Sequence, residues 1–285
     1  MEKRRYALRI AYDGGAFRGF QRQPGLPTVE QALLRALEPM GIAPRLEVAA
    51  RTDAGVHALS QFVSFWARAD LEPAVLREAL NRGTPPELTC IEAWRAPPGF
   101  HARASAASRT YFYLVGLSPL EGLEGRAWLL PDERAFAGVH PDALDVPAMS
   151  EALASAVGEH DFTGFARPGE QRGTVRTLLR ADVEAAAWGP LYSLRLEGRG
   201  FLRAQVRNLV GTAVAVGLGL APARRIADLL RARERYRGVR APAWGLTLEK
   251  VEYPPDALPS QGDADSPAAD RSPYLASRSE TASRR

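Results

Sequence analysis

Hydrophobic and polar positions alternate through the first third of the chain in a pattern that predicts short strands separated by helices. Residues 6–12, "YALRIAY", form the first expected strand, and the "DGG" after them predicts a turn. Thr28 opens a helix as its N-cap, Gln31 completes a capping box, and the helix runs to about Pro39. The remaining elements are expected to be strands at 46–50, 61–66 and 88–94 and a helix beginning at Pro73. The order is therefore β-α-β-β-α-β.

The second part of the chain repeats this order of elements. The expected elements are strands at 109–115, 175–184, 191–196 and 246–253, a helix opened by Asp145 and Pro147 and closed by Gly158, a helix over 201–216, and another opened by Pro222. This predicts an α+β fold of two ferredoxin-like (βαββαβ) halves, residues 1–105 and 106–254. Residues 255–285 are rich in Pro, Ser, Ala and Asp and are expected to be a disordered tail. A docked arm that uses Tyr274 and Leu275 stays open as the alternative.

Composition narrows the class of protein only slightly. The chain of 285 residues is 46% hydrophobic and 25% charged, which is ordinary for a globular protein. Its net charge is +4, and only two of its 37 basic residues are lysines. A GC-rich genome and a polyanionic partner both explain this arginine bias. Since no stretch of about 18 apolar residues and no signal-peptide core is present, we expect a cytoplasmic protein that does not cross a membrane.

Residues that bind metals are sparse. Cys90 is the single cysteine, and the four histidines His57, His101, His140 and His160 lie far apart. Neither a Cys-x-x-Cys pair nor a His-Glu-x-x-His helix occurs. We therefore expect neither a metal nor a cofactor.

The segment 50–57, "ARTDAGVH", gathers an arginine, a carboxylate and an imidazole around a glycine, just ahead of a strand. Such a group suits proton transfer or nucleophilic chemistry. Each member also has a structural alternative: Asp53 as a turn or cap residue, His57 as a buried structural histidine and Arg51 as a surface charge.

Two further loops carry more chemistry than turns require. Residues 12–23, "YDGGAFRGFQRQ", add Phe17, Phe20 and Gln21 to a glycine turn. Residues 100–114, "FHARASAASRTYFYL", place His101, Arg103 and Arg109 ahead of a strand that carries Tyr111 and Tyr113 on one face. Core packing is the favoured interpretation of Tyr113.

A third stretch, residues 198–212 or "GRGFLRAQVRNLVGT", spaces Arg199, Arg203 and Arg207 four apart, so that on a helix they would form one stripe. Arg207 stands among apolar residues, and a half-buried arginine requires a carboxylate partner.

Together these motifs resemble the family of bacterial tRNA pseudouridine synthases called TruA. The resemblance runs from about Leu8 to Pro254 and includes "RTDAGVH", "YDGGAFRGFQRQ", "FHARASAASRTYFY", "FLRAQVRNLVG" and "APAWGLTLEKVEYP". The sequence departs from the family pattern at Ala50, where glycine is usual, at Thr84, where leucine is usual, and at Thr247, where a bulkier residue is usual. The tail beyond Pro254 lies outside the resemblance.

The resemblance implies the pseudouridine synthase fold, with the active site in the cleft between the halves, and the isomerisation of uridines 38, 39 and 40 in the anticodon stem-loop of tRNA. It makes Asp53 the nucleophile, Arg207 its counter-charge, and Tyr111 the residue that packs on the uracil. Arg51 would fill the space left by the extruded nucleotide. It also implies a homodimer. The residues expected to contact the substrate are Arg51, Tyr111, Gln21, Phe20, His57 and Arg103.

The arginines of residues 224–240 are expected either to bind RNA or to form a solvated helix face. Two other functions stay open. An RNA-binding module could use the same duplicated sheet without catalysis. A structural or regulatory protein could keep the fold and have lost the activity. Release of the hydrogen at uracil C5 distinguishes an isomerase from both.

Overall fold

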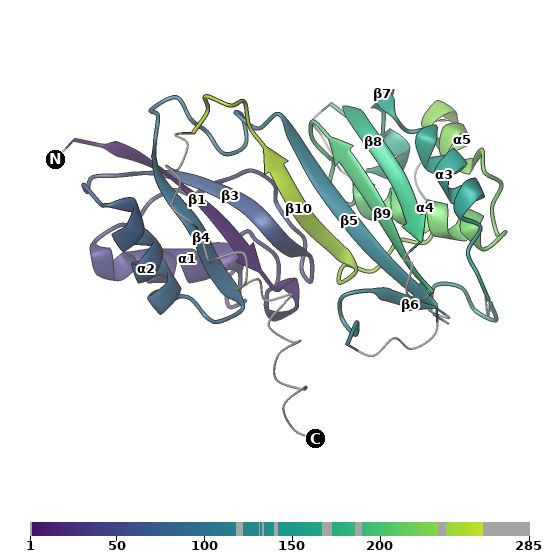
Figure 1. The fold of residues 1–285 in the computed structure, drawn as a ribbon, viewed down its shortest axis with the longest axis horizontal. Coiled ribbons are helices and arrows are strands. Elements are labelled where there is room, and N and C mark those ends of the chain that lie inside the picture. The colour runs from purple at the N-terminus through teal and green to yellow at the C-terminus, as the bar shows by residue number, and fades with distance from the viewer. Residues whose placement is uncertain are drawn as a thin grey trace, which may run out of the picture. The chain divides into compact units, whose positions relative to one another are not determined.

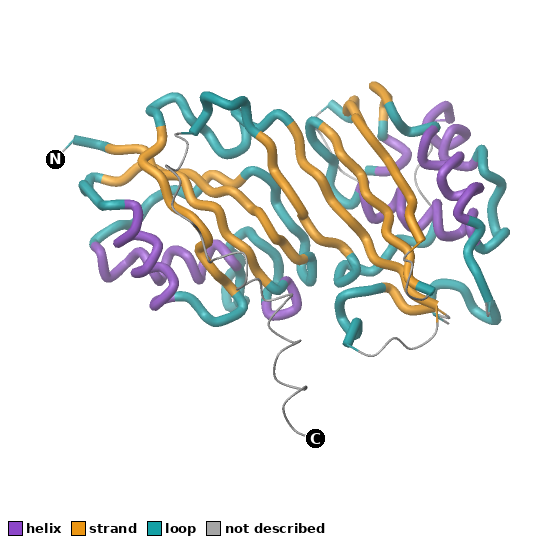
Figure 2. The backbone as a smooth tube through the Cα atoms, viewed as in Figure 1, coloured by secondary structure: helices purple, strands orange, loops and turns teal. Residues whose placement is uncertain are grey.

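The computed structural model describes residues 2–117, 122–130, 132, 134–139, 142–166, 173–185, 190–232 and 238–258. Over these ranges the chain is mixed α+β with a large sheet (Figures 1 and 2). It divides into two compact units, one formed by residues up to Ala107 with the chain from Leu248 onward, the other by Ser108–Thr247. No helix in the described ranges combines the length and the apolar character that crossing a membrane requires.

The last strand, β10 (Leu246–Glu252), passes from the second unit into the first. The expected division into 1–105 and 106–254 had placed it wholly in the second half. In the first unit β10 lies next to β3, and the ring of Tyr253 packs 4.9 Å from Phe62 and 5.1 Å from Phe100, measured between ring centroids. These contacts explain why the strand ends in the first unit. Of the expected tail, residues 259–285 lie outside the described residues.

The first unit follows the predicted order β-α-β-β-α-β. Its elements are β1 (Arg4–Tyr12), α1 (Val29–Leu37), β2 (Glu47–Val48), β3 (His57–Ala67), α2 (Pro73–Gly83) and β4 (Leu88–Ala96). The strands lie in the order β4-β1-β3, and β2 pairs with β3. The predicted N-cap is confirmed, because the side chain of Thr28 accepts a hydrogen bond from the backbone N–H of Gln31.

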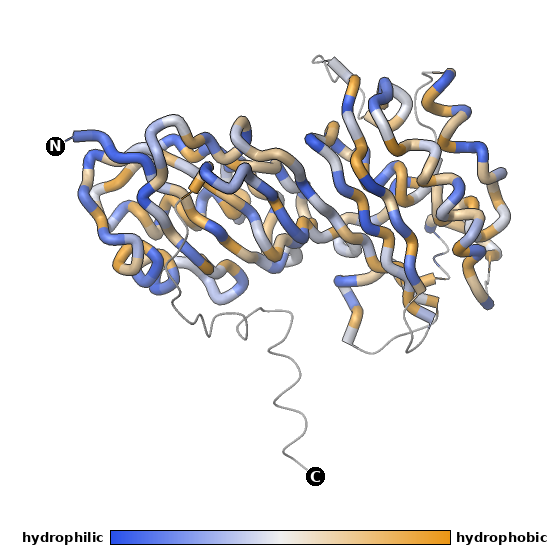
Figure 3. Tube along the Cα trace, turned by 45° about the horizontal axis from the view of Figure 1, so that its top comes forward, coloured by the Kyte–Doolittle hydropathy of each residue, from blue (hydrophilic) through white to orange (hydrophobic). Residues whose placement is uncertain are grey.

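The core of the first unit follows from alternation along the paired strands. Tyr6 stands opposite Phe65 and Leu8 opposite Val63, and all four are fully buried. The helices α1 and α2 pack against each other so closely that a Cβ on Gly83 would lie 2.9 Å from the Cβ of Ala36. Figure 3 shows the alternating hydropathy along the strands. Burial of about 25 cal/mol for each Å² of apolar surface is the main force that holds these layers together.

A buried ion pair joins the sheet of the first unit to the segment after β4. Arg5 is 4% exposed and donates to the carbonyl of Phe100 at 2.8 Å, to Ser64 Oγ at 2.9 Å and to Glu47. The Ser64 hydroxyl donates to Glu47 in turn and accepts from the N–H of Ala102. Arg5, Ser64 and Glu47 therefore all have hydrogen-bond partners, as a buried charge requires.

The second unit contains β5 (Ser108–Leu117), β6 (Trp128–Leu130), α3 (Val146–Ala154), β7 (Gly158–Asp161), β8 (Val175–Ala185), β9 (Leu191–Gly198), α4 (Gln205–Gly217) and α5 (Arg225–Ala232). Its strands lie in the order β5-β9-β8-β7, with β6 parallel to β5 (Figure 1). The helix α4 is almost entirely buried. It is therefore the central core element of this unit.

Two predicted helix bounds in this unit are wrong. The helix α3 ends at Ala154, and Gly158 is instead the first residue of β7, where its φ of 110° is suited to glycine. The helix α4 begins at Gln205 and not at 201, because Ala204 adopts the left-handed conformation with φ 65°. The short strands β6 and β7 were not predicted; both are shorter than the alternation needed to identify them.

The reactivity of the Cys90 thiol, on β4, provides a test of the packing of the first unit. It is 3% exposed, and burial raises the pKa of its thiol to about 12. Its backbone pairs with the side chain of Asn81, whose Oδ1 accepts at 2.7 Å and whose Nδ2 donates at 3.0 Å. Because the thiolate is the reactive form, we expect Ellman's reagent at pH 8 to label native protein at least ~100-fold more slowly than protein in guanidinium. Rapid labelling of the native chain would contradict this burial.

Candidate functional site

Two loops of the first unit come into backbone contact around the segment 50–57. A Cβ added to Gly14 would lie 2.2 Å from the carbonyl oxygen of Val56, and one added to Gly19 would lie 3.0 Å from the oxygen of Thr52. Gly19 also has a φ of 93°, which favours glycine. The N–H of Phe20 donates to the same Thr52 oxygen at 3.1 Å. The loop that carries Asp53 therefore packs directly against Gly14 and Gly19.

Buried polar side chains hold the other side of this loop. The hydroxyl groups of Tyr12 and Thr52 are 2.8 Å apart, and Gln61 Nε2 donates to Tyr12 at 3.3 Å. Burial raises the pKa of Tyr12 to about 12, so its hydroxyl stays protonated at neutral pH. Gln61, fully buried on β3, also accepts from the N–H of Ala50 at 3.2 Å and donates to its carbonyl at 2.6 Å.

The hydrogen bonds from Gln61 reach only the backbone of residue 50, which alanine provides as well as glycine. Ala50 is not among the residues with positive φ, so its backbone does not need the freedom of glycine. The departure at Thr84 is accommodated differently, because its hydroxyl lies within hydrogen-bonding distance of the carbonyls of Leu80 at 3.0 Å and Leu88 at 2.9 Å. This joins the end of α2 to the start of β4. Thr247 is 1% exposed.

His57 is the first residue of β3 and is 1% exposed. Its Nδ1 accepts from the N–H of Gly14 at 3.1 Å and lies 3.2 Å from Asp13 Oδ1. The imidazole therefore fixes the turn at residues 13–15 against the start of β3. This geometry suits a residue that shapes the loop; its expected contact with substrate stays a prediction.

Asp53 lies where the two loops meet and is half-buried. Its carbonyl accepts from the N–H of Val56 at 3.2 Å, which closes a turn around Gly55, whose φ is 83°. The main chain on both sides of Asp53 is therefore fixed by the contacts of Thr52 and Val56, and the residue keeps some exposure to solvent.

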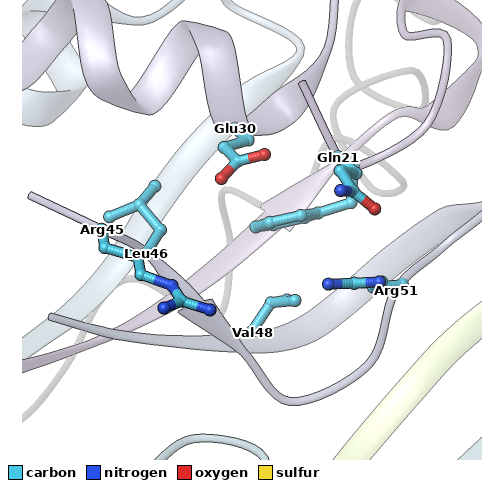
Figure 4. A pocket seen from close by; sticks show the side chains of 7 residues that line it. Gln21, Glu30, Arg45, Leu46, Val48 and Arg51 are labelled. Atoms are coloured by element: carbon cyan, nitrogen blue, oxygen red, sulfur yellow. The ribbon is translucent and has the colours of Figure 1, made fainter. Parts of the chain in front are cut away.

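A polar pocket of about 180 Å³ opens beside this loop. It is lined by Phe20, Gln21, Glu30, Arg45, Leu46, Val48 and Arg51. Figure 4 shows the guanidinium groups of Arg45 and Arg51 on opposite sides, with Glu30 and Gln21 above them. The structure thus gathers Phe20, Gln21 and Arg51, three of the residues expected to contact substrate, in one wall.

Not every aromatic residue of that loop is available to a ligand. Phe17 is 5% exposed and packs edge-on against Tyr12, with ring centroids 6.2 Å apart. Phe17 therefore belongs to the core, and the prediction that it exceeds what a structural loop requires is wrong. Phe20 is 2% exposed but reaches the pocket wall.

In the second unit, Tyr111 and Tyr113 share a face of β5. Tyr113 is fully buried, and its hydroxyl donates to the carbonyl of Pro242 at 2.9 Å, which confirms its assignment to the core. Burial raises the pKa of Tyr113 well above the usual value, and the nearby charge of Arg207 opposes this. Tyr111 is 7% exposed and packs edge-to-face on Phe201, at 5.4 Å between centroids.

Arg207 occupies the first turn of α4 and is half-buried, as its apolar neighbours predicted. Its Nε donates to the carbonyl of Ala241 at 2.7 Å, while the N–H of Ala241 donates to the carbonyl of Arg207 at 3.1 Å. The predicted stripe of three arginines is wrong, because Arg199 and Arg203 both precede the helix.

The remaining arginine candidates lie near the surface. Arg103 is exposed, and its N–H donates to Nδ1 of His101 at 3.1 Å. In the segment 224–240, Arg224 and Arg231 are exposed and both pair with Asp228 on α5. Exposed pairs of this kind contribute little to stability. Residues 233–237 of that segment lie outside the described residues.

Three positioning residues escaped the sequence analysis: Tyr12, Gln61 and Asn208. Asn208 is fully buried; its Nδ2 donates to the carbonyl of Phe165 at 2.8 Å, and its Oδ1 accepts from Arg240 at 3.0 Å. Each of the three is a polar residue at an inward-facing position of a strand or helix, and this feature of the sequence could have identified it. Among the described residues, no group of three or more His, Cys, Asp or Glu side chains is placed to hold a metal.

A family model and the sequences of curated relatives match this chain. A family model described as tRNA pseudouridine synthase matches residues 152–254. The tRNA pseudouridine synthase A of Methylacidiphilum infernorum is 39% identical over 257 residues, which cover 88% of this chain and 96% of the relative. That of Frankia casuarinae is 41% identical over 267 residues, covering 88% and 90%. A solved H/ACA ribonucleoprotein bound to a substrate RNA with 2′-deoxyuridine is distant, at 14% identity and a TM-score of 0.33, covering 72% of this chain and 44% of its own.

Substitution of Gly14 tests the contact between the two loops. The added methyl group of Gly14→Ala would meet the backbone oxygen of Val56 at 2.2 Å, so the loops must separate. We expect a loss of about 1–3 kcal/mol in the free energy of unfolding, measured by urea denaturation. Gly99→Ala in the same unit is the matched control, because a Cβ there meets nothing within 4 Å. Equal stability of the two variants would contradict the close contact between Gly14 and Val56.

Proposed function

Since the relatives show that the chain belongs to the tRNA pseudouridine synthase A family, an isomerase family, we propose that it converts uridines 38, 39 and 40 of the tRNA anticodon stem-loop to pseudouridine, with Asp53 as the nucleophile. The observation that carries the proposal is the half-buried Asp53 in a loop whose backbone is fixed on both sides by buried groups. The match to one relative covers 88% of this chain and 96% of the relative, which supports a full-length enzyme activity.

The reaction needs no outside electron or atom. The bond between uracil N1 and ribose C1′ breaks, the base turns, and C1′ joins C5. The hydrogen at C5 leaves as a proton, and N1 gains one, so the product is an isomer. A carboxylate supports this by attacking as a nucleophile or by stabilising cationic character at the ribose.

Asp53 has the features that this chemistry demands. Asp53 lies in a turn ahead of β3 and not at the N-terminus of a helix, so a helix-capping role does not apply to it. Its loop rests directly on the backbone of residues 14 and 19. Holding a reacting group in place before the reaction lowers the activation free energy by several kcal/mol. The backbone contacts of the Asp53 loop provide such positioning.

Two residues of the second unit complete the proposed site. Arg207, whose Nε donates to the carbonyl of Ala241, is the proposed counter-charge of the Asp53 carboxylate. Tyr111, held edge-on by Phe201, packs against the uracil. The proposal assigns each unit one ferredoxin-like half of the pseudouridine synthase fold.

The substrate is held mainly through phosphate and shape. Arg51 and Gln21 contact the RNA from the pocket wall beside the Asp53 loop, and exposed Arg103 contacts the backbone. Phe20 belongs to the same lining, and His57 fixes the turn at residues 13–15. Contacts with phosphates do not distinguish one base sequence from another. This arrangement therefore suits modification at three neighbouring positions. We further propose a cytoplasmic homodimer.

The substitution Asp53→Asn tests the nucleophile. Asparagine keeps the size and the turn-forming ability of aspartate, so we expect an unchanged melting temperature. Binding of tRNA in a filter-retention assay should stay within about twofold of the parent, because arginine–phosphate contacts dominate the affinity. Release of tritium from uracil C5 should fall by at least ~10⁴-fold.

The matched control is Asp70→Asn, which removes a partly exposed carboxylate of the same unit that pairs with Arg4 and Arg95. This variant should release tritium at the rate of the parent. Substantial tritium release by Asp53→Asn would return Asp53 to a structural role. Binding of tRNA without tritium release by the parent chain would favour an RNA-binding module.

Substitution of Arg207 tests the counter-charge. Arg207→Ala should lower kcat by at least ~100-fold, because the carboxylate loses its partner. Arg207→Lys restores the charge but lacks the planar guanidinium that donates to the carbonyl of Ala241 and that suits paired hydrogen bonds to a carboxylate, so it should recover about a tenth of the activity. Tritium release under single-turnover conditions measures both variants. Parent-like rates in the two would exclude Arg207 from the site.

A further inference from the structure

An exposed tryptophan stands out on the second unit. Trp244 is 44% exposed, and it is the single aromatic residue among the exposed large hydrophobic side chains of the described chain. The others are the aliphatic residues Leu26, Val75, Val157, Val175, Leu179 and Leu220. By contrast, Trp94 and Trp128 are buried. An indole left in water forfeits a large hydrophobic gain unless a partner covers it.

The loop that carries Trp244 is fixed on both sides. Before it, the carbonyl of Ala241 accepts from Arg207 at 2.7 Å, and that of Pro242 accepts from Tyr113 at 2.9 Å. After it, the carbonyl of Gly245 accepts from the N–H of Leu114 at 3.1 Å. Gly245 lies so close to Tyr113 that an added Cβ would be 2.6 Å from its ring. The loop is therefore a rigid support.

The same bonds place Trp244 three residues from the group that holds Arg207. The same loop carries one charge: Arg240 is exposed, and its Nε donates to Asn208 on α4 at 3.0 Å. An exposed aromatic ring and an exposed arginine in one loop suit a nucleic acid, whose bases stack on aromatic rings while its phosphates meet positive charges. A protein partner would instead favour an apolar surrounding, and the exposed aliphatic residues lie on other segments.

We propose that Trp244 is a stacking platform for an unpaired base of the tRNA loop, in a nucleotide close to the reacting uridine. This inference rests on the proposed function, which makes Arg207 part of the active site. The backbone of the loop is fixed before binding, so little backbone entropy is lost when the base binds. Every base has a face that stacks, and such a contact holds the loop without selecting its sequence.

The first test compares three variants of the full chain with an unmodified tRNA transcript. Trp244→Ala and Trp244→Leu should weaken filter-retention binding about tenfold, since both remove the aromatic face. Trp244→Phe should stay within about twofold of the parent. The dependence of binding on salt should not change, because no phosphate contact is lost. Leu220→Ala, another exposed apolar residue of this unit, is the control and should bind like the parent.

The second test follows tryptophan fluorescence during titration with the same transcript. The parent should be quenched as RNA binds, and Trp244→Phe should lose most of that quenching. Equal binding by Trp244→Ala and the parent would overturn the platform. So would a change in the sedimentation of Trp244→Ala without RNA, since this would show that a second copy of the chain covers the ring. Neither readout uses turnover; failure of the Asp53 assignment therefore appears separately, as tritium release by Asp53→Asn.

Discussion

The direct approach of one backbone to another is the constraint on which the candidate site depends. In the first unit, residues 14 and 19 lie against the carbonyl groups of Val56 and Thr52, at distances that leave no room for a side chain. The loop of Asp53 is thereby fixed by main-chain atoms, which cannot change rotamer. Buried side chains also fix the position of this loop relative to β3, through the hydrogen bonds that link Gln61, Tyr12 and Thr52.

The second unit uses the same device. A Cβ on Gly211 of α4 would lie 1.9 Å from the carbonyl oxygen of Val239, and Gly245 lies against the ring of Tyr113. Residues 239–245 are thus pressed onto α4 and β5. As a result, the carbonyl of Ala241 reaches the guanidinium of Arg207. In each unit a residue proposed for catalysis is positioned by a close contact that only glycine permits.

Charged groups inside the first unit make its packing specific. Arg5 is almost fully buried, and leaving it unpaired would cost several kcal/mol. Its partners Phe100, Ser64 and Glu47 come from three separate segments. A shift of β1 by one residue would turn Arg5 into the opposite face and break all three bonds. The register of the strands beneath the Asp53 loop is therefore fixed by polar satisfaction as well as by hydrophobic burial.

The sequence by itself determined the order of elements in the first unit, the cap at Thr28, the buried Tyr113 and the half-buried Arg207, because alternation, capping and apolar neighbours are local signals. Its motifs also carried the family resemblance that the relatives confirm. Tertiary structure alone decided that Phe17 belongs to the core, that α4 starts after a left-handed Ala204, and that β10 enters the first unit. Those outcomes depend on partners distant in the chain, such as Tyr12 for Phe17, or on a backbone conformation that alanine seldom adopts. No pattern along the chain encodes either of them.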